Sequence, residues 1–161
     1  MNIFAGRSAR ISDKTGPPIF QSALDLIGNT PLFDLTDDNS GARIYAKAEF
    51  QNPSGSIKDR MVANIVQKAE TRGELRTGDT IVEATSGNTG VSLAMIASIK
   101  GYKAIIIAPD STSGVKKLMM EFFGAELVLT DGSEGIKVTV ERARQLVRER
   151  GGFLLDQFKS M

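Results

Sequence analysis

The sequence predicts an α/β fold in which a doubly wound parallel sheet lies between two layers of helices, as αβα. Two observations lead to this prediction. Apolar runs too short for a helix and bounded by Gly, Pro or Asp are typical of buried strands, and they occur at 81–84, 104–108, 127–129 and 153–155. Segments of helix length separate them, at 88–100, 115–123 and 136–150. Strand and helix therefore alternate, as the crossovers of a parallel sheet require.

The helices are predicted from apolar spacing and from glycines at their ends. Within 136–150, one face carries apolar side chains: Ile136, Val140, Ala143 and Val147. Glycines at positions 101, 124 and 151 stand where C-terminal caps belong. An earlier helix is predicted to begin after Ser56, whose hydroxyl can cap it. Its apolar face is expected to contain Val62, Ile65, Val66 and Ala69.

The first fifty residues are organised differently. Residues 1–20 mix Gly, Ser, Lys, Arg and a pair of prolines without apolar periodicity, which predicts a loosely ordered arm. Residues 22–27 predict a short helix that Gly28 stops. Residues 44–50 alternate well enough to predict a strand.

The composition excludes several classes of chemistry. The 161 residues include no Cys and no His, so thiolate nucleophiles, imidazole bases, disulfides and zinc centres are excluded and no metal site is predicted. A net charge of +1 offers no one-signed field for nucleic acid or an acidic membrane. The first twenty residues contain no apolar segment with the length of a signal-peptide core, and no later stretch approaches the length of a membrane span, so a cytoplasmic location is expected.

The loop over residues 85–90, Thr-Ser-Gly-Asn-Thr-Gly, directly follows one predicted strand and opens the next helix. At this edge of a parallel sheet, helix N-termini present backbone amides to ligands, and hydroxyl and amide side chains add donors. The loop therefore predicts an anion site, for phosphate or for carboxylate. It matches neither a Walker loop nor Gly-x-Gly-x-x-Gly, which argues against a nucleotide. The alternative is that these are ordinary turn and capping residues.

Lys58 is the second candidate, in the first turn of the helix that follows Ser56. The positive end of the helix dipole disfavours an ammonium ion there, which favours a neutral and nucleophilic amine. The preceding segment over 52–56, Asn-Pro-Ser-Gly-Ser, is typical of a loop that positions a functional group. The alternative is a solvated surface lysine, which is what most lysines are.

Together these segments resemble the cysteine synthases, the O-acetylserine sulfhydrylases among the fold-type II pyridoxal-phosphate enzymes. The resemblance begins after residue 21 and includes motifs in the family's order at 26–32, 52–60, 83–90, 124–130 and 157–158. It implies that Lys58 forms a Schiff base with pyridoxal phosphate and that Asn88 lies near the ring hydroxyl of the cofactor. It also implies which residues surround the substrate carboxylate: Thr85, Ser86, Gly87, Thr89 and Gln157.

The reaction implied by this resemblance is the β-replacement of O-acetylserine by sulfide, which gives L-cysteine and acetate while Lys58 takes the α-proton. A cystathionine β-synthase-like enzyme is an alternative, because its lysine and loop motifs are similar. A non-catalytic module that binds the C-terminal tail of serine acetyltransferase is a second alternative. The family also implies a homodimer.

Two departures from the family pattern are visible. Members usually carry Ser-x-Glu-Arg where this chain has Ser113-Gly114-Val115-Lys116, so a charged pair is absent. Members are also longer, so the chain is expected to be a truncated, weakly active or inactive form. The expected organisation is an arm over 1–20, a fragment of the larger domain over 21–50, the smaller α/β domain over 51–157, and a link over 158–161 to a missing half.

Overall fold

The computed structural model describes residues 19–37 and 41–157. The chain divides into two compact units, Met1–Ile57 and Lys58–Met161. Residues 1–18 of the expected arm and the expected link over 158–161 lie outside the described residues. The domain boundary expected between residues 50 and 51 stays a prediction. Each unit contains a sheet of its own.

The sheet of the second unit has four parallel strands in the order β5-β4-β3-β6. Their bounds are β3 Thr80–Ala84, β4 Lys103–Pro109, β5 Glu126–Thr130 and β6 Phe153–Leu154. All the apolar runs that predicted strands form strands, and the α/β fold class is confirmed. The chain adds β4 and β5 on one side of β3 and returns to add β6 on the other. The strand order therefore reverses beside β3.

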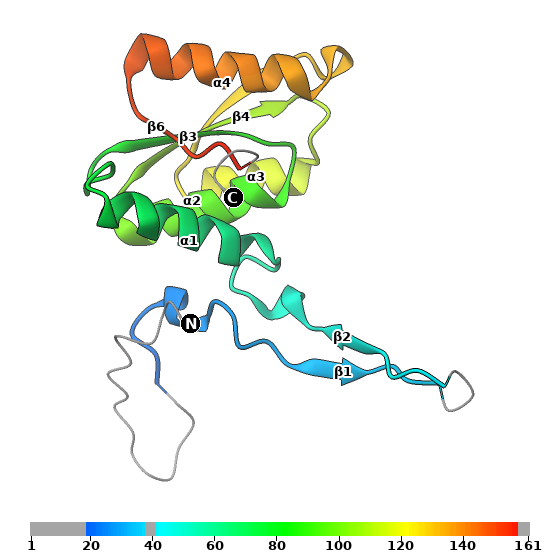
Figure 1. Ribbon diagram of the computed structural model, residues 1–161. Helices are drawn as coiled ribbons and strands as arrows, with labels where there is room; N and C mark the ends of the chain where they lie inside the picture. Colours follow the sequence, from blue (N-terminus) through cyan, green and yellow to red (C-terminus); the bar gives the residue numbers. More distant parts are fainter. Residues whose placement is uncertain (1–18, 38–40, 158–161) are drawn as a thin grey trace. The chain divides into compact units, whose positions relative to one another are not determined.

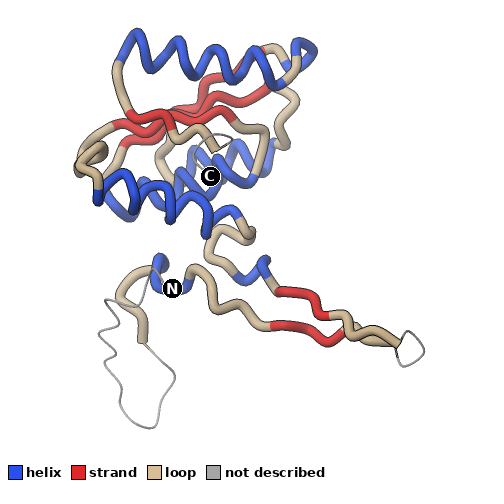
Figure 2. Tube along the Cα trace, in the orientation of Figure 1, coloured by secondary structure: helices blue, strands red, loops and turns tan. Residues whose placement is uncertain are grey.

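Helices cover both faces of this sheet (Figure 1 and Figure 2). Helix α4, Ile136–Arg150, covers one face. The other face is covered by α1 Lys58–Thr71, α2 Asn88–Lys100 and α3 Gly114–Phe122. Between α4 and the sheet lies a buried apolar cluster: Val82, Ala84, Ile105, Ile107, Ala143 and Leu146. Each large aliphatic side chain buried there contributes roughly 1.5–3 kcal/mol through the hydrophobic effect.

Helices α2 and α4 differ in how they are buried. In α2, every residue from Thr89 to Ala97 is buried, because apolar or small residues occupy all sides of the helix. Helix α4 is amphipathic, and of its predicted apolar face Val140, Ala143 and Val147 pack on the sheet. Ile136, at the start of α4, is exposed instead. Glycines end both helices with positive φ angles, 75° at position 101 and 74° at position 151.

The first unit contains a two-stranded antiparallel sheet, formed by β1 Leu32–Asp34 and β2 Tyr45–Lys47. The strand predicted over 44–50 is therefore shorter than expected. The 3-10 turn Glu49–Gln51 replaces its second half, because the Asn52 amide donates to the carbonyl oxygen of Glu49 at 2.8 Å and holds the chain in a turn.

The helix predicted over 22–27 is a single 3-10 turn, Ala23–Leu26. The hydroxyl of Ser22 accepts from the N–H of Leu24 and the carboxylate of Asp25 accepts from the N–H of Ser22, which caps the turn. Gly28 follows with a φ of 91°, a positive value that glycine readily adopts and that ends the turn as predicted. In the part of the chain that the structure describes, no helix is both long enough and apolar enough to cross a membrane.

Candidate active site

Three segments of the second unit lie at the carboxyl edge of its sheet. The loop over 85–90 follows β3 and opens α2. The first turn of α1, which begins at Lys58, lies at the same edge (Figure 1). Because β6 runs parallel to β3, residues 155–157 also emerge there. The strand order reverses beside β3, which is where open α/β sheets bind their ligands.

The loop over 85–90 combines buried and exposed hydroxyl and amide groups. Thr85 and Thr89 are buried, whereas Ser86 and Asn88 are exposed and Gly87 is half-buried. The Thr85 hydroxyl accepts from the N–H of Gly87 at 3.1 Å, which closes the turn before α2 begins. The backbone amides of the first turn of α2 add the positive end of the helix dipole. This arrangement is suited to a bound anion.

Gln157 lies against this loop, although 68 residues separate it from Thr89. Its Oε1 accepts from the Thr89 hydroxyl at 2.8 Å, and its Nε2 donates to the carbonyl oxygen of Ala84 at 3.5 Å. Thr89 and Gln157, both predicted to surround a substrate carboxylate, are therefore in direct contact. A ligand carboxylate at this place would compete with Gln157 for the Thr89 hydroxyl.

Lys58 is half-buried at the first position of α1. The helix behind it is firmly packed: Asp59, Val62, Ala63, Ile65, Val66 and Ala69 are all buried. The predicted apolar face of this helix is confirmed by that burial. The place of Lys58 at the sheet edge is thus set by the packing of α1 rather than by a mobile loop.

The segment that leads to Lys58 is held inside the first unit by Asn52. The buried Asn52 side chain accepts from the N–H of Gly28 at 2.9 Å and donates to the Glu49 carboxylate at 2.9 Å. The same carboxylate accepts from the Thr30 hydroxyl at 2.6 Å. The sequence motifs at 26–32 and 52–60 are therefore joined by hydrogen bonds.

Lys116 is a neighbour of the loop that was not predicted as a binding residue. A Cβ atom placed on Gly87 would lie 3.1 Å from Nζ of Lys116, so the ammonium group lies close over this glycine. The sequence signal was present, because Lys116 stands where the family pattern usually has Arg. Compared with the family pattern, the segment Ser113–Lys116 therefore lacks the acidic residue but still has a cation beside the loop.

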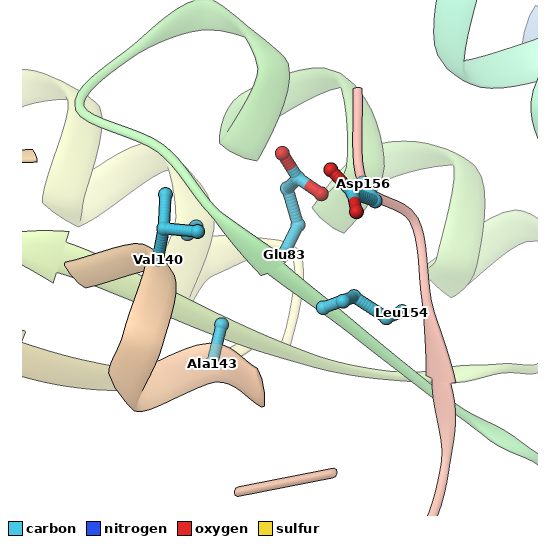
Figure 3. A pocket seen from close by; sticks show the side chains of 6 residues that line it. Glu83, Val140, Ala143, Leu154 and Asp156 are labelled. Atoms are coloured by element: carbon cyan, nitrogen blue, oxygen red, sulfur yellow. The ribbon is translucent and has the colours of Figure 1, made fainter. Parts of the chain in front are cut away.

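Glu83 is a second residue that was not predicted. It lies in β3 with 2% of its surface exposed. Figure 3 shows its carboxyl group pointing toward that of Asp156. Burial, followed by the negative charge of Asp156, raises the pKa of Glu83 to about 8, against the opposing effect of the N–H groups of Asp156 and Gln157 and of the Gln157 side chain. The signal in the sequence was a carboxyl group inside an apolar strand.

Gly90 shows how tightly the loop is packed, and we expect Gly90→Ala to lower the free energy of unfolding by about 1–3 kcal/mol. The added Cβ would lie 2.6 Å from Met120 Cε and 2.9 Å from Thr85 Cγ2. Alanine favours a helix by about 1 kcal/mol over glycine, but this gain does not offset contacts so short. Urea denaturation measures the change.

Gly114→Ala is the matched control for this prediction. Gly114 begins α3, and a Cβ placed on it would meet no atom within 4 Å. This substitution is expected to be neutral or slightly stabilising. Equal unfolding free energies for Gly90→Ala and the unchanged chain would contradict the close packing of the loop.

This fold, with a lysine at the start of one helix and a loop rich in hydroxyl and amide groups at the start of the next, matches a known family of proteins. The model of the family described as pyridoxal-phosphate dependent enzyme matches residues 23–161, and the chain belongs to this family. Among its relatives, the cysteine synthase of Staphylococcus aureus is 44% identical over 137 residues, and cysteine synthase B of Pseudomonas aeruginosa is 45% identical over 141 residues.

The relatives are longer than this chain. The two alignments cover 84% and 86% of this chain but 44% and 47% of those relatives, so it spans about half the length of the curated relatives that it matches. Solved structures agree in fold. An O-ureido-L-serine synthase superposes with a TM-score of 0.82 at 40% identity, covering 88% of this chain and 45% of that one. An O-acetylserine dependent cystathionine β-synthase from Helicobacter pylori superposes with a TM-score of 0.79 at 33% identity, covering 84% and 46%.

The donor set at the carboxyl edge fits pyridoxal phosphate, the cofactor of the family. Lys58 offers a primary amine, the group that bonds to the aldehyde of this cofactor. Asn88 is exposed and offers an amide. Within residues 19–37 and 41–157, no group of three or more acidic side chains lies close enough together to hold a metal ion.

Proposed function

We propose that this chain supplies the cofactor lysine and the substrate-carboxylate loop of a cysteine synthase-like enzyme. The proposed reaction is the β-replacement of O-acetylserine by sulfide to give L-cysteine and acetate. The observation that carries the proposal is the 2.8 Å hydrogen bond between Thr89 and Gln157, which joins the loop over 85–90 to the segment after β6. The cysteine synthases among the relatives support the same reaction.

In this proposal the loop holds the amino-acid substrate by its carboxylate. The backbone amides at the start of α2 and the hydroxyls of Thr85, Ser86 and Thr89 are the donors for one carboxylate oxygen or the other. The Nε2 group of Gln157, which now donates over the long distance of 3.5 Å to Ala84, is a further donor. Fixing the carboxylate at several points orients the rest of the substrate, which lowers the entropic part of the barrier.

Lys58 has two tasks in this proposal. It would hold the cofactor through its amine, and that amine, when free, would accept the α-proton of the substrate as a general base. Pyridoxal phosphate, when bound, withdraws electrons from the substrate α-carbon. No imidazole or thiol is needed for these steps, and the sequence has none. Asn88 is the proposed donor to the ring hydroxyl of the cofactor.

Thr89→Val tests the carboxylate loop. Valine keeps the shape of threonine but removes the hydroxyl that donates to Gln157, so we expect the KM for O-acetylserine to rise about tenfold, which corresponds to about 1.4 kcal/mol. The measurement is cysteine formation from O-acetylserine and sulfide by the chain mixed with pyridoxal phosphate. Thr71→Val, at the far end of α1, is the control and should leave KM unchanged. Equal KM values for Thr89→Val and the unchanged chain would remove Thr89 from the site.

A cystathionine β-synthase-like reaction is the second candidate. The Helicobacter pylori structure, which shares the fold, is described as an O-acetylserine dependent cystathionine β-synthase. The two reactions share the amino-acid substrate and differ in the nucleophile, which is sulfide in one and the thiol of homocysteine in the other. Offering the same chain sulfide and homocysteine in parallel assays separates them by product, cysteine against cystathionine.

The binding partners stay proposals as well. Ser86 and Asn88 are exposed donors, so they would bind the terminal carboxylate of a peptide as readily as the carboxylate of an amino acid. This favours the C-terminal tail of serine acetyltransferase as a partner. The variants Thr85→Ala and Asn88→Ala should weaken binding of a peptide that ends in isoleucine. A homodimer and a cytoplasmic location stay predictions.

A further inference from the structure

The Glu83 carboxyl group is buried at the base of the proposed site without a complete set of partners. Glu83 Oε2 has no hydrogen-bond partner among the residues that the structure describes, although only 2% of the residue is exposed. A buried carboxylate oxygen without a partner is costly, whereas a protonated oxygen can donate a hydrogen bond to a neighbouring acceptor. The carboxyl group of Glu83 points toward that of Asp156, which is a nearby acceptor (Figure 3).

Glu83 and Asp156 line one small cavity, together with apolar side chains from β3, β6 and α4: Ala84, Leu154, Val140 and Ala143. The cavity offers ≈ 10 Å³ for the centre of a water molecule, which is about enough for one water. Two ionised carboxylates that face each other repel, and the buried Glu83 has little solvent around it to screen that repulsion, although Asp156 is only half-buried. A proton on Glu83 removes the repulsion.

The turn that carries Asp156 is held from both sides. Before it, the N–H of the buried Leu155 donates to the carbonyl oxygen of Val82 at 2.9 Å. After it, Gln157 contacts Thr89 and Ala84. Asp156 itself has a φ of 44°, a left-handed conformation that is uncommon for residues other than glycine. Gln157 directly follows Asp156 in this turn, so a shift of the Asp156 carboxyl group would change the direction of the Gln157 side chain.

Asp156 is the other charged side chain among the described residues that line this cavity. Helix α2 carries no charged side chain before Lys100, at its far end, and β4 carries only Lys103, opposite Thr80 at the other end of β3. Helix α4 presents Val140 and Ala143 to the cavity.

We propose that a protonated Glu83 donates to the carboxyl group of Asp156 and thereby positions Gln157 for the substrate carboxylate. Glu83 is a positioning residue in this inference, because it acts on the ligand through Gln157. The inference rests on the proposed function for the role of Gln157, but the contact between Glu83 and Asp156 and its effect on the turn do not depend on catalysis.

The consequence is a site that changes with pH. Burial and the charge of Asp156 raise the pKa of Glu83 to about 8, so Glu83 holds its proton at neutral pH and loses it above pH 8. Repulsion between two carboxylates then displaces the turn at Asp156. Gln157 moves away from Thr89, and the substrate carboxylate loses a donor.

The experiment is a pH titration of the whole 161-residue chain, without cofactor, by two-dimensional NMR of its side-chain amides. In the unchanged chain, the Gln157 amide resonances should shift through a single transition with a midpoint near pH 8. Glu83→Gln, a neutral carboxamide of the same shape, should show no transition between pH 6 and pH 10. Glu121→Gln, an exposed acid on α3, is the control and should keep the transition.

Asp156→Asn is the second variant, since asparagine tolerates a positive φ as aspartate does. It removes the repulsion that Asp156 exerts on Glu83, so the midpoint should move to lower pH. Gln157 resonances that stay constant from pH 6 to pH 10 in the unchanged chain would overturn the inference. A transition with the same midpoint in Glu83→Gln would overturn it as well. Failure to form cysteine would instead count against the proposed function alone.

Discussion

Lys58→Ala is expected to abolish the visible absorbance that develops when pyridoxal phosphate is mixed with the chain. In the proposed function the amine of Lys58 is the group that bonds covalently to the cofactor, and alanine has no such group. Borohydride reduction followed by peptide mass mapping gives a readout that does not depend on activity. In the unchanged chain the cofactor should be found on the peptide that contains Lys58.

Lys68→Ala is the matched control for this experiment. Lys68 lies in the last turn of the same helix and is exposed, so its loss should change neither the absorbance nor the labelled peptide. Equal labelling of Lys58→Ala and of the unchanged chain would show that the cofactor reacts with surface lysines. Labelling spread over several lysines would also show a reaction with surface lysines. In either case the assignment of Lys58 would be wrong.

The free energy of unfolding is expected to fall as the pH rises from about 5 to 8, and Glu83 is the cause. Its pKa is about 8 in the folded chain, against an ordinary value of 4.5. Between these two values the folded chain binds more protons than the unfolded chain, so each rise in pH favours unfolding. The slope approaches about 1.4 kcal/mol per pH unit where the difference is one whole proton. Above pH 8 the contribution is constant.

Other shifted groups act outside this range of pH. Hydrogen bonds from Thr36, Ser133 and Arg148 lower the pKa values of Asp34, Asp131 and Glu141, respectively, so these groups matter below pH 5. Burial raises the pKa of Tyr102 to about 12. Urea denaturation at several pH values between 5 and 8 therefore reports chiefly on Glu83. Glu83→Gln should flatten the dependence, and a slope that is equally steep in this variant would assign it to other groups.

Much of the fold could be predicted because its signals are local. Helices over 88–100 and 136–150 were predicted with the bounds that the structure has, since glycines end them and apolar spacing identifies them. The strand predicted over 44–50 was too long. An alternating pattern cannot show that the Asn52 side chain, which binds both Glu49 and Gly28, turns the chain after β2.

The candidate site was predicted less completely than the fold. Lys58 and the loop over 85–90 were identified by residue type and by their places at helix starts. Glu83 was overlooked because its neighbours make the run read as an ordinary buried strand. Lys116 was noticed only as a departure from a pattern, because its position over Gly87 depends on how α3 packs against α2.

By itself the sequence determined the order of strands and helices, the family to which the chain belongs, and the residue types available for chemistry. These depend on periodicity, on caps and on motifs that lie within a few residues of one another. Only the tertiary structure decided that Thr89 meets Gln157 and that Glu83 faces Asp156. Those contacts join residues some 70 positions apart. They exist because β6 pairs with β3 in parallel, which brings the ends of both strands to one edge of the sheet.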